Sequence, residues 1–308
     1  KERFGGIDRL YGSGALERFA GCHVTVVGIG GVGSWAVEAL ARSGIGKLTL
    51  IDADDLCVSN TNRQLPALEG QYGRAKVEAM GERCRAINPG IDLDLKPQFL
   101  TPTNMGELLE APGDVVLDAC DSFRSKVEAI AYCRRRKQPI VAVGSAGGRS
   151  DVTQIRVRDL SRTEHDAMLS LIRKKLRGEF NFPKNHDRYF GVPAVYSLEN
   201  VRYPQADGSV CGIRPQLGKD EALRLDCGAD PAGLLAGVRD RLGQRPEFAA
   251  EPIGQEVLST VRFLEAKVAA RAGAMRGPGR ISHGPDLVAR LHARGLPVTE
   301  TSGYGADR

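Results

Sequence analysis

The chain has 308 residues, 42% of them hydrophobic and 26% charged, with a formal net charge of +5, which is ordinary globular composition and permits an anionic partner without demanding one. No apolar run approaches the roughly 18 residues that span a bilayer and no signal peptide is visible, so we expect a cytoplasmic protein without a membrane segment. The seven cysteines are scattered and form no C-x-x-C pair, which argues against a disulfide framework and against a tetrahedral zinc site.

The first half of the chain alternates strand-like and helix-like segments. Short β-branched runs are typical of buried parallel strands, and apolar residues at helical spacing are typical of amphipathic helices. We predict strands at residues 24–29, 47–52, 92–100, 114–122 and 139–148, helices at 34–44, 73–88 and 124–137, and an antiparallel strand at 153–160. The predicted fold class is α/β, a Rossmann-like mixed and mostly parallel sheet with helices on both faces.

The second half has a different character. Residues 161–190 are polar and basic and carry a predicted helix at 168–180, so we expect an insertion beyond the core sheet. Residues 192–211 indicate strands around an Asp-Gly turn. Residues 229–308 are rich in arginine and alanine and helical in pattern, and we interpret them as a C-terminal extension of unknown role after a nucleotide-binding domain at 1–228.

A glycine-rich turn follows the first predicted strand. It reads G-x-G-G-x-G, and its glycines are Gly28, Gly30, Gly31 and Gly33. Glycines here allow a tight turn and let backbone N–H groups approach a phosphate at a helix N-terminus. Asp52 ends the second strand, where a carboxylate accepts hydrogen bonds from ribose hydroxyls. NAD and ATP both meet these requirements, so the turn predicts a nucleotide without choosing between them.

The choice of nucleotide rests on polar residues beyond the strand ends. They are Asn60, Arg63 and Gln64 after the second strand, Lys76 at the start of the next helix, and Asp118 and Asp121 at the end of the third buried strand. An adenylating site must neutralise a triphosphate and stabilise charge on the α-phosphate, which needs an arginine, a lysine and a metal-holding aspartate. A hydride-transfer site needs a flat apolar slot instead, so these residues favour ATP.

Each of these residues also has a structural interpretation. Arg63 and Lys76 are individually typical of a solvated surface, and Asp121 could equally serve as a helix N-cap beside Ser122. Their occurrence together, in this order after a glycine turn, favours the functional interpretation.

The same motifs are similar to a known family. The glycine turn, the strand-end Asp52 and Asp54, and the segments SNTNRQ, GRAKVE and LDACDS resemble the ThiF/MoeB-type activating enzymes, relatives of ubiquitin-activating enzymes. Further segments, among them RFGGIDRLYG, AYCRRRK, SAGG and YPQADGSVC, resemble the tRNA threonylcarbamoyladenosine dehydratases of that family. The resemblance covers about residues 3–227, and as a set these motifs are highly specific.

The resemblance implies a homodimer that uses ATP and Mg²⁺. The carboxylate of N6-threonylcarbamoyladenosine in tRNA would be adenylated, and ring closure would then expel AMP. Arg63, Lys76 and Asp121 would be catalytic, with Asp121 holding Mg²⁺. The implied nucleotide-binding residues are Gly28, Gly30, Gly31, Gly33, Asp52, Asp54, Asn60, Arg63, Gln64, Lys76, Asp121 and Ser122. A cysteine desulfurase or another sulfur-acceptor system is a further implied partner.

Three departures from the family pattern matter. Relatives often carry an arginine where this chain has Gly6, and it reaches the phosphates across the dimer, so Arg3 or Arg9 would have to serve. The paired zinc cysteines common in MoeB and ThiF are absent, which argues against activation of a sulfur carrier. After Cys227 the usual family ending is replaced by the arginine-rich extension.

Three other functions stay open at the level of sequence. The first is adenylation of the C-terminal glycine of a ubiquitin-like sulfur carrier. The second is an NAD-dependent oxidoreductase, against which the basic groups at Arg63 and Lys76 count. The third is a non-catalytic tRNA-binding or scaffold protein that keeps a nucleotide fold.

Two basic clusters are secondary candidates. Residues 134–137 and 172–177 are more typical of solvated helix faces, although such clusters can contact phosphates. Within the second cluster, Arg173 and Arg177 are predicted to share a helix face while Lys174 lies to one side. We expect removal of charge there to leave the packing undisturbed.

Two further features have a structural and a functional interpretation. Cys211 and Cys227 are interpreted as ordinary cysteines rather than thioester nucleophiles. The loop with Gly144, Gly147 and Gly148 either borders a substrate pocket or is only a tight turn.

Overall fold

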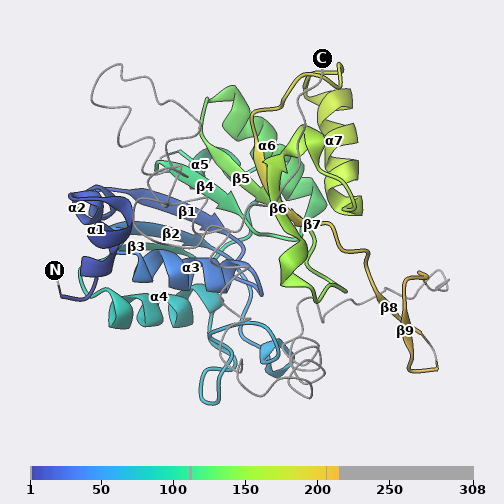
Figure 1. Cartoon of the computed structure of the whole chain (residues 1–308). Helices are drawn as coiled ribbons and strands as arrows, with labels where there is room; N and C mark the ends of the chain where they lie inside the picture. The colour runs from blue at the N-terminus through green and yellow to red at the C-terminus, as the bar shows by residue number, and fades with distance from the viewer. Residues whose placement is uncertain (1, 111–112, 206, 215–308) are drawn as a thin grey trace, which may run out of the picture. The chain divides into compact units, whose positions relative to one another are not determined.

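The computed structural model describes residues 2–110, 113–205 and 207–214 (Figure 1). Seven strands form one sheet in the order β3-β2-β1-β4-β5-β7-β6. These strands are β1 His23–Val27, β2 Lys47–Ile51, β3 Asp92–Lys96, β4 Val115–Asp118, β5 Ile140–Val143, β6 Ile155–Asp159 and β7 Pro193–Ser197. All neighbouring pairs are parallel except β6 and β7, which confirms the predicted mixed sheet. The extension predicted at 229–308 lies outside the described residues.

Helices cover both faces of the sheet. They are α1 Gly5–Tyr11, α2 Ala15–Ala20, α3 Gly33–Arg42, α4 Lys76–Ile87, α5 Met105–Leu108, α6 Phe123–Arg135 and α7 Ala167–Glu179. Helices α3 and α4 pack on one face, and α5, α6 and α7 pack on the other (Figure 1). None of the helices in this described part of the chain is long and apolar enough to cross a membrane.

Alternation along the strands divides the interior into two cores. Val24 and Val26 of β1 face the core beneath α3 and α4, whereas Val27 faces the core beneath α6. The same alternation recurs in β4, where Val116 and Leu117 belong to opposite cores. Strands that are buried on both faces are read from the sequence as continuous apolar runs, which is why their prediction is confirmed.

The basic segment is part of this packing. Helix α7 connects β6 to β7 and buries Leu169, Ile172 and Leu176 completely in the core that it shares with α6. The segment that follows it, residues 193–197, supplies strand β7 inside the sheet itself. The expectation that this region stands apart from the core packing is therefore wrong for its helix.

Helices α1 and α2 are not predicted from the sequence. Helix α1 has seven residues and opens on two glycines, so its intrinsic helix propensity is poor. Tertiary contacts hold the pair instead: Phe19 is completely buried, and the Asp8 carboxylate accepts a hydrogen bond of 2.9 Å from the Leu16 backbone N–H. The predicted Asp-Gly turn is confirmed, since Tyr203–Pro204 (β8) and Val210–Cys211 (β9) pair as an antiparallel hairpin.

Candidate active site

The direction of strand order reverses between β1 and β4. Strands β2 and β3 lie on one side of β1, while β4 and β5 lie on the other. In an open parallel sheet, ligands bind outside the carboxyl ends of the strands at such a switch point. Here the glycine turn follows β1, Asp52 follows β2 and Asp118 ends β4, so the sheet gathers the candidate groups at one edge.

Two glycines of the turn are required by close packing. Gly28 has a φ of +85°, and a Cβ atom there would lie 2.8 Å from the Cα atom of Cys120. A Cβ atom on Gly33 would lie 1.8 Å from the carbonyl oxygen of Gly28. The turn after β1 therefore presses directly against the loop after β4, with no room for a side chain at either glycine.

Arg63 lies beside the glycine turn. A Cβ atom on Gly31 would lie 3.3 Å from the Arg63 Cγ atom. The Arg63 Nη1 atom donates to the Ser59 carbonyl oxygen at 3.1 Å and to the Asn62 Oδ1 atom at 2.9 Å. The indole N–H of Trp35 on α3 donates to the Arg63 carbonyl oxygen at 3.1 Å. These contacts hold the arginine next to the turn, where the sequence could only infer proximity.

Asn60 and Gln64 are both buried in the same loop but differ in their bonding. The Asn60 Oδ1 atom accepts a 3.0 Å hydrogen bond from the Cys57 backbone N–H, which closes the loop on itself. The Gln64 Oε1 atom is buried and has no hydrogen-bond partner among the described residues. The Gln64 Nε2 atom lies 4.0 Å from where a Gly30 Cβ atom would stand. Gln64 thus brings an unused buried acceptor to the turn, and such acceptors are costly unless a ligand supplies a donor.

The Asp52 carboxylate organises the loop that follows β2. Its Oδ2 atom accepts a 2.6 Å hydrogen bond from the Ile29 backbone N–H in the glycine turn, and its Oδ1 atom accepts one of 2.9 Å from the Asp54 N–H. Asp52 is 8% exposed. Each carboxylate oxygen can accept a second bond, so the group can hold the turn and still receive a ribose hydroxyl.

Lys76 is almost fully buried at the first position of α4. Its ammonium donates to the Asp54 carboxylate at 2.7 Å, and its backbone N–H donates to the Asp54 carbonyl oxygen at 3.0 Å. The Lys76 side chain is only 6% exposed, whereas that of Asp54 is 51% exposed. The structure therefore excludes the interpretation of Lys76 as a solvated surface residue.

A buried ion pair that the sequence analysis misses lies beneath the site. Asp118 and Lys126 are both 0% exposed, and the Lys126 ammonium lies 2.9 Å from the Asp118 Oδ1 atom. The same ammonium donates to the Asp118 carbonyl oxygen at 2.9 Å. Lys126 stands in the middle of an amphipathic helix, and the only signal for its role is a lysine on the apolar face of α6.

Asp121 lies on the exposed side of the same loop. Among the described residues it makes no hydrogen bond or ion pair. The N-cap of α6 is Ser122, whose hydroxyl accepts a 3.4 Å hydrogen bond from the Ser125 N–H, so the alternative interpretation of Asp121 as the cap is wrong. No group of three or more acidic, histidine or cysteine side chains that could hold a metal occurs in the described part of the chain. A single exposed carboxylate fits Mg²⁺, which proteins commonly bind through one or two carboxylates together with phosphates and water.

The glycine loop after β5 is clamped to the start of α7. Gly148 has a φ of +72°, and a Cβ atom there would lie 2.4 Å from the Arg202 carbonyl oxygen. The Asp166 carboxylate accepts hydrogen bonds from the Ser145 N–H at 2.8 Å and the Leu169 N–H at 2.8 Å. It also pairs with the buried Arg149 guanidinium at 3.1 Å. The loop is a tight turn that Asp166 ties to a helix, an arrangement that the sequence analysis misses.

The two arginines considered for the dimer contact differ in their surroundings. The Arg3 Nη1 atom donates to the last carbonyl oxygens of α4, at Ala86 and Ile87. Arg9 makes no hydrogen bond or ion pair among the described residues. Arg3 thus has a local role as a helix C-terminal contact, while the Arg9 guanidinium has none.

Burial raises the pKa of four cysteines among the described residues. Cys22, Cys84 and Cys133 are buried, and burial raises the pKa of Cys22 to about 11 and that of Cys84 to about 12. At the site itself, burial and then the charge of Asp118 raise the pKa of Cys120 well above its ordinary value. The thiolate is the reactive form, so Cys120 is poorly suited to thioester chemistry. Cys227 lies outside the described residues.

Comparison with known proteins gives consistent matches. The ThiF family matches residues 7–186. The tRNA threonylcarbamoyladenosine dehydratase of Escherichia coli (strain K12) is 49% identical over 227 residues, covering 74% of this chain and 84% of that protein. The crystal structure of the E. coli tRNA N6-threonylcarbamoyladenosine dehydratase, TcdA, in complex with ATP is similar with a TM-score of 0.64 and 43% identity, covering 79% of this chain and 96% of the other. The AMP complex of the same protein is similar with a TM-score of 0.65 and 43% identity, covering 80% and 96%.

Proposed function

The chain belongs to the ThiF family, and from that premise we propose that it dehydrates N6-threonylcarbamoyladenosine in tRNA at the expense of ATP. The carboxylate of the threonylcarbamoyl group is adenylated, and ring closure then expels AMP. A carboxylate oxygen is a poor leaving group and AMP is a good one, which explains why a dehydration consumes ATP. The observation that carries the proposal is the identity to a relative named for this activity over 84% of that relative's length.

We assign the phosphate end of ATP to the groups around the glycine turn. Backbone N–H groups at the start of α3 and the Arg63 guanidinium would face the phosphates, because both lie at this turn. The Lys76 ammonium would neutralise phosphate charge as well, held in place by Asp54. Mg²⁺ on Asp121 would offset the negative charge of the phosphates as pyrophosphate leaves.

We assign the nucleoside end to Asp52 and Gln64. Asp52 keeps accepting capacity for ribose hydroxyls, and the Gln64 Oε1 atom is an acceptor without a partner beside Gly30. Asn60 and Ser122 act indirectly, because Asn60 closes the loop that carries Arg63 and Ser122 caps α6.

We further propose that the protein works as a homodimer. The family resemblance implies an arginine that reaches the partner's phosphates, and Arg9 suits that task better than Arg3, because Arg3 is engaged at the end of α4. A cysteine desulfurase or sulfur-acceptor partner is also implied by the resemblance, and co-purification of the full chain with such an enzyme would test it.

The test of the proposed reaction uses the full chain, tRNA carrying threonylcarbamoyladenosine, ATP and Mg²⁺. We expect mass spectrometry of the digested nucleosides to show the loss of one water from the modified adenosine, with one AMP released for each. A reaction without ATP is the control. Adenylation of the C-terminal glycine of a ubiquitin-like protein, with no change in the tRNA nucleoside, would instead establish the sulfur-carrier alternative.

A further inference from the structure

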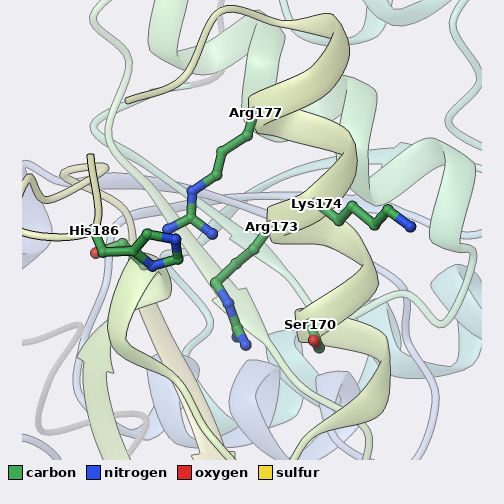
Figure 2. Close-up of a pocket in the computed structure, with 6 residues that line it drawn as sticks. Ser170, Arg173, Lys174, Arg177 and His186 are labelled. Atoms are coloured by element: carbon green, nitrogen blue, oxygen red, sulfur yellow. The ribbon is translucent and has the colours of Figure 1, made fainter. Parts of the chain in front are cut away.

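A basic cavity lies on α7, away from the glycine turn. It has a volume of about 400 Å³ and is lined by Ser161, Ser170, Arg173, Lys174, Arg177 and His186. Figure 2 shows the Arg173 and Arg177 side chains on the same side of the helix, with the His186 ring facing the Arg177 guanidinium. The Lys174 ammonium extends to the other side, as its predicted helical position requires (Figure 2).

The two arginines are held in place by uncharged groups. Arg173 donates to the hydroxyl of Thr163, and the Arg177 Nε atom donates to the Pro183 carbonyl oxygen at 3.2 Å. The Arg177 guanidinium also lies over the Phe190 ring, 5.0 Å from its centroid. Neither arginine makes an ion pair with any acid of the described residues. Contacts with uncharged groups thus orient the two guanidinium groups without neutralising them. Because these contacts belong to the packing around α7, the expectation that the charges of Arg173 and Arg177 can be removed without disturbing the packing is wrong.

Burial makes this arrangement costly unless an anion is bound. Desolvation, and then the neighbouring charge of Arg177, lower the pKa of Arg173. The Arg177 Nη2 atom and the Ser161 hydroxyl oxygen are both buried without a hydrogen-bond partner among the described residues. An unused guanidinium N–H and an unused hydroxyl on residues that line one cavity are donors that phosphate oxygens can accept from.

We propose that this cavity, between α7 and the loop at residues 183–188, binds a phosphate group of the tRNA backbone. Arginine is favoured over lysine at phosphate sites because its planar fork presents several N–H donors in a fixed geometry. A cavity of about 400 Å³ has room for a phosphate with its neighbouring ribose. The proposal deepens the proposed function and rests on it, since tRNA is the anion that the enzyme must hold.

The position of α7 allows the phosphate site to orient the tRNA as well as to bind it. Asp166, the N-cap of α7, accepts from the Ser145 N–H in the loop that follows β5, at the same sheet edge as the glycine turn. A phosphate held on α7 would therefore stand in a fixed relation to that loop. Phosphate contacts position a nucleic acid without reading its sequence. The pocket would set the register of the tRNA so that the modified base reaches the adenylating edge.

The test measures tRNA binding by the full chain across a series of potassium chloride concentrations. The pocket variants Arg177→Gln and His186→Glu each lower the net charge by one unit, with histidine counted as neutral. The control variants Arg188→Gln and Lys184→Gln make the same charge change on exposed residues of the same loop that do not line the cavity. His186 is exposed, so its replacement removes nothing from the core even where the loss of Arg177 costs stability.

We expect each pocket variant to bind tRNA roughly tenfold more weakly, and Arg177→Gln also to lose about one unit of the salt slope, while each control loses little of either. ATP binding measured by calorimetry should be unchanged in all four variants, because none of them lies at the glycine turn. Equal weakening by pocket and control variants would show a diffuse positive field and overturn the proposal.

A second measurement separates a tRNA phosphate from free phosphate. Inorganic phosphate that raises the melting temperature of the wild type, combined with unchanged tRNA binding by His186→Glu, would assign the cavity to a small anion and also overturn the proposal. Failure of the proposed dehydration would give a different result. The wild type and the variants would then bind tRNA as expected, but the wild type would leave the modified nucleoside unchanged.

Discussion

Asp118 and Asp121 stand three residues apart at the end of β4 and have opposite surroundings. Asp118 is completely buried and already neutralised by Lys126, so it has no charge to offer a ligand. Asp121 is exposed and without a partner among the described residues. A carboxylate that can reach solvent is the one that can hold a hydrated Mg²⁺.

The first prediction concerns Asp121. Asp121→Asn keeps the shape of the side chain and removes the charge, so AMP formation with modified tRNA should fall roughly a hundredfold or more. The free energy of unfolding should change by less than about 0.5 kcal/mol, because the position is exposed. Asp55→Asn, at another exposed aspartate near the same edge, is the matched control and should stay active. Near-normal turnover by the Asp121→Asn protein would show that this carboxylate holds no metal.

The second prediction concerns the buried pair. Lys126→Met leaves the Asp118 carboxylate buried without a countercharge and should lower the free energy of unfolding by about 3–5 kcal/mol, measured by urea titration. Replacing both residues with apolar ones, Asp118→Leu with Lys126→Met, should recover most of that loss. A double variant no more stable than Lys126→Met would mean that the pair has some other role than mutual neutralisation.

At the scale of elements, the central strands β1 and β2 are linked by more than their ladder. His23 begins β1, and its Nε2 atom lies 2.8 Å from the Thr49 Oγ1 atom on β2. Burial lowers the pKa of His23, and Lys47 lowers it further, while Asp114, Asp92 and Asp94 act in the opposite direction. The net effect favours the neutral form of an imidazole that bonds Thr49 on the neighbouring strand.

The third prediction follows from the sign of that shift. Because the pKa of His23 is lower in the folded chain than its ordinary 6.5, the unfolded chain takes up the proton first. The contribution of His23 to stability is therefore complete above pH 6.5 and is lost as the pH falls through the folded pKa. His23→Gln should flatten the pH dependence of the free energy of unfolding in that window. Parallel curves for the wild type and His23→Gln in urea titrations at a series of pH values would contradict this.

At the scale of the whole molecule, the parallel sheet brings distant segments to one edge. The glycine turn, the loop after β2 and the loop after β4 come from three separate strand ends, and β1 lies between β2 and β4. The proposed function adds to these groups an arginine from the partner of a homodimer. Arg9 is the candidate for that contact, because Arg3 is engaged at the end of α4.

The fourth prediction tests the shared site. If Arg9 serves the partner's phosphates, Arg9→Ala and Asp121→Asn should each be inactive alone. Co-refolding the two variants should restore about a quarter of the wild-type activity, because half of the dimers formed at random carry one site with both residues intact. Sedimentation of the wild type as a dimer is the accompanying measurement. No recovery on mixing would place Arg9 outside the site.

Local sequence patterns determine most of the secondary structure of this protein. The sheet strands, the glycine turn, the helices that flank it and the antiparallel β6 follow from periods of two and of 3.6 residues and from glycine, which act within a few residues of chain. The common edge of Gly28, Asp52 and Asp118 was predictable because each of them ends or directly follows a strand, and parallel strands end at a common edge.

Tertiary structure alone decided which charged groups are buried and what they meet. Lys126 as the partner of Asp118, Asp166 as the clamp on the Ser145 loop, and the cavity around Arg173 and Arg177 depend on segments up to dozens of residues apart. In sequence, a lysine or arginine on a helix looks the same whether it is solvated or buried. The cost of desolvation and its compensation by a partner exist only after the helix has packed, so no local pattern reports them.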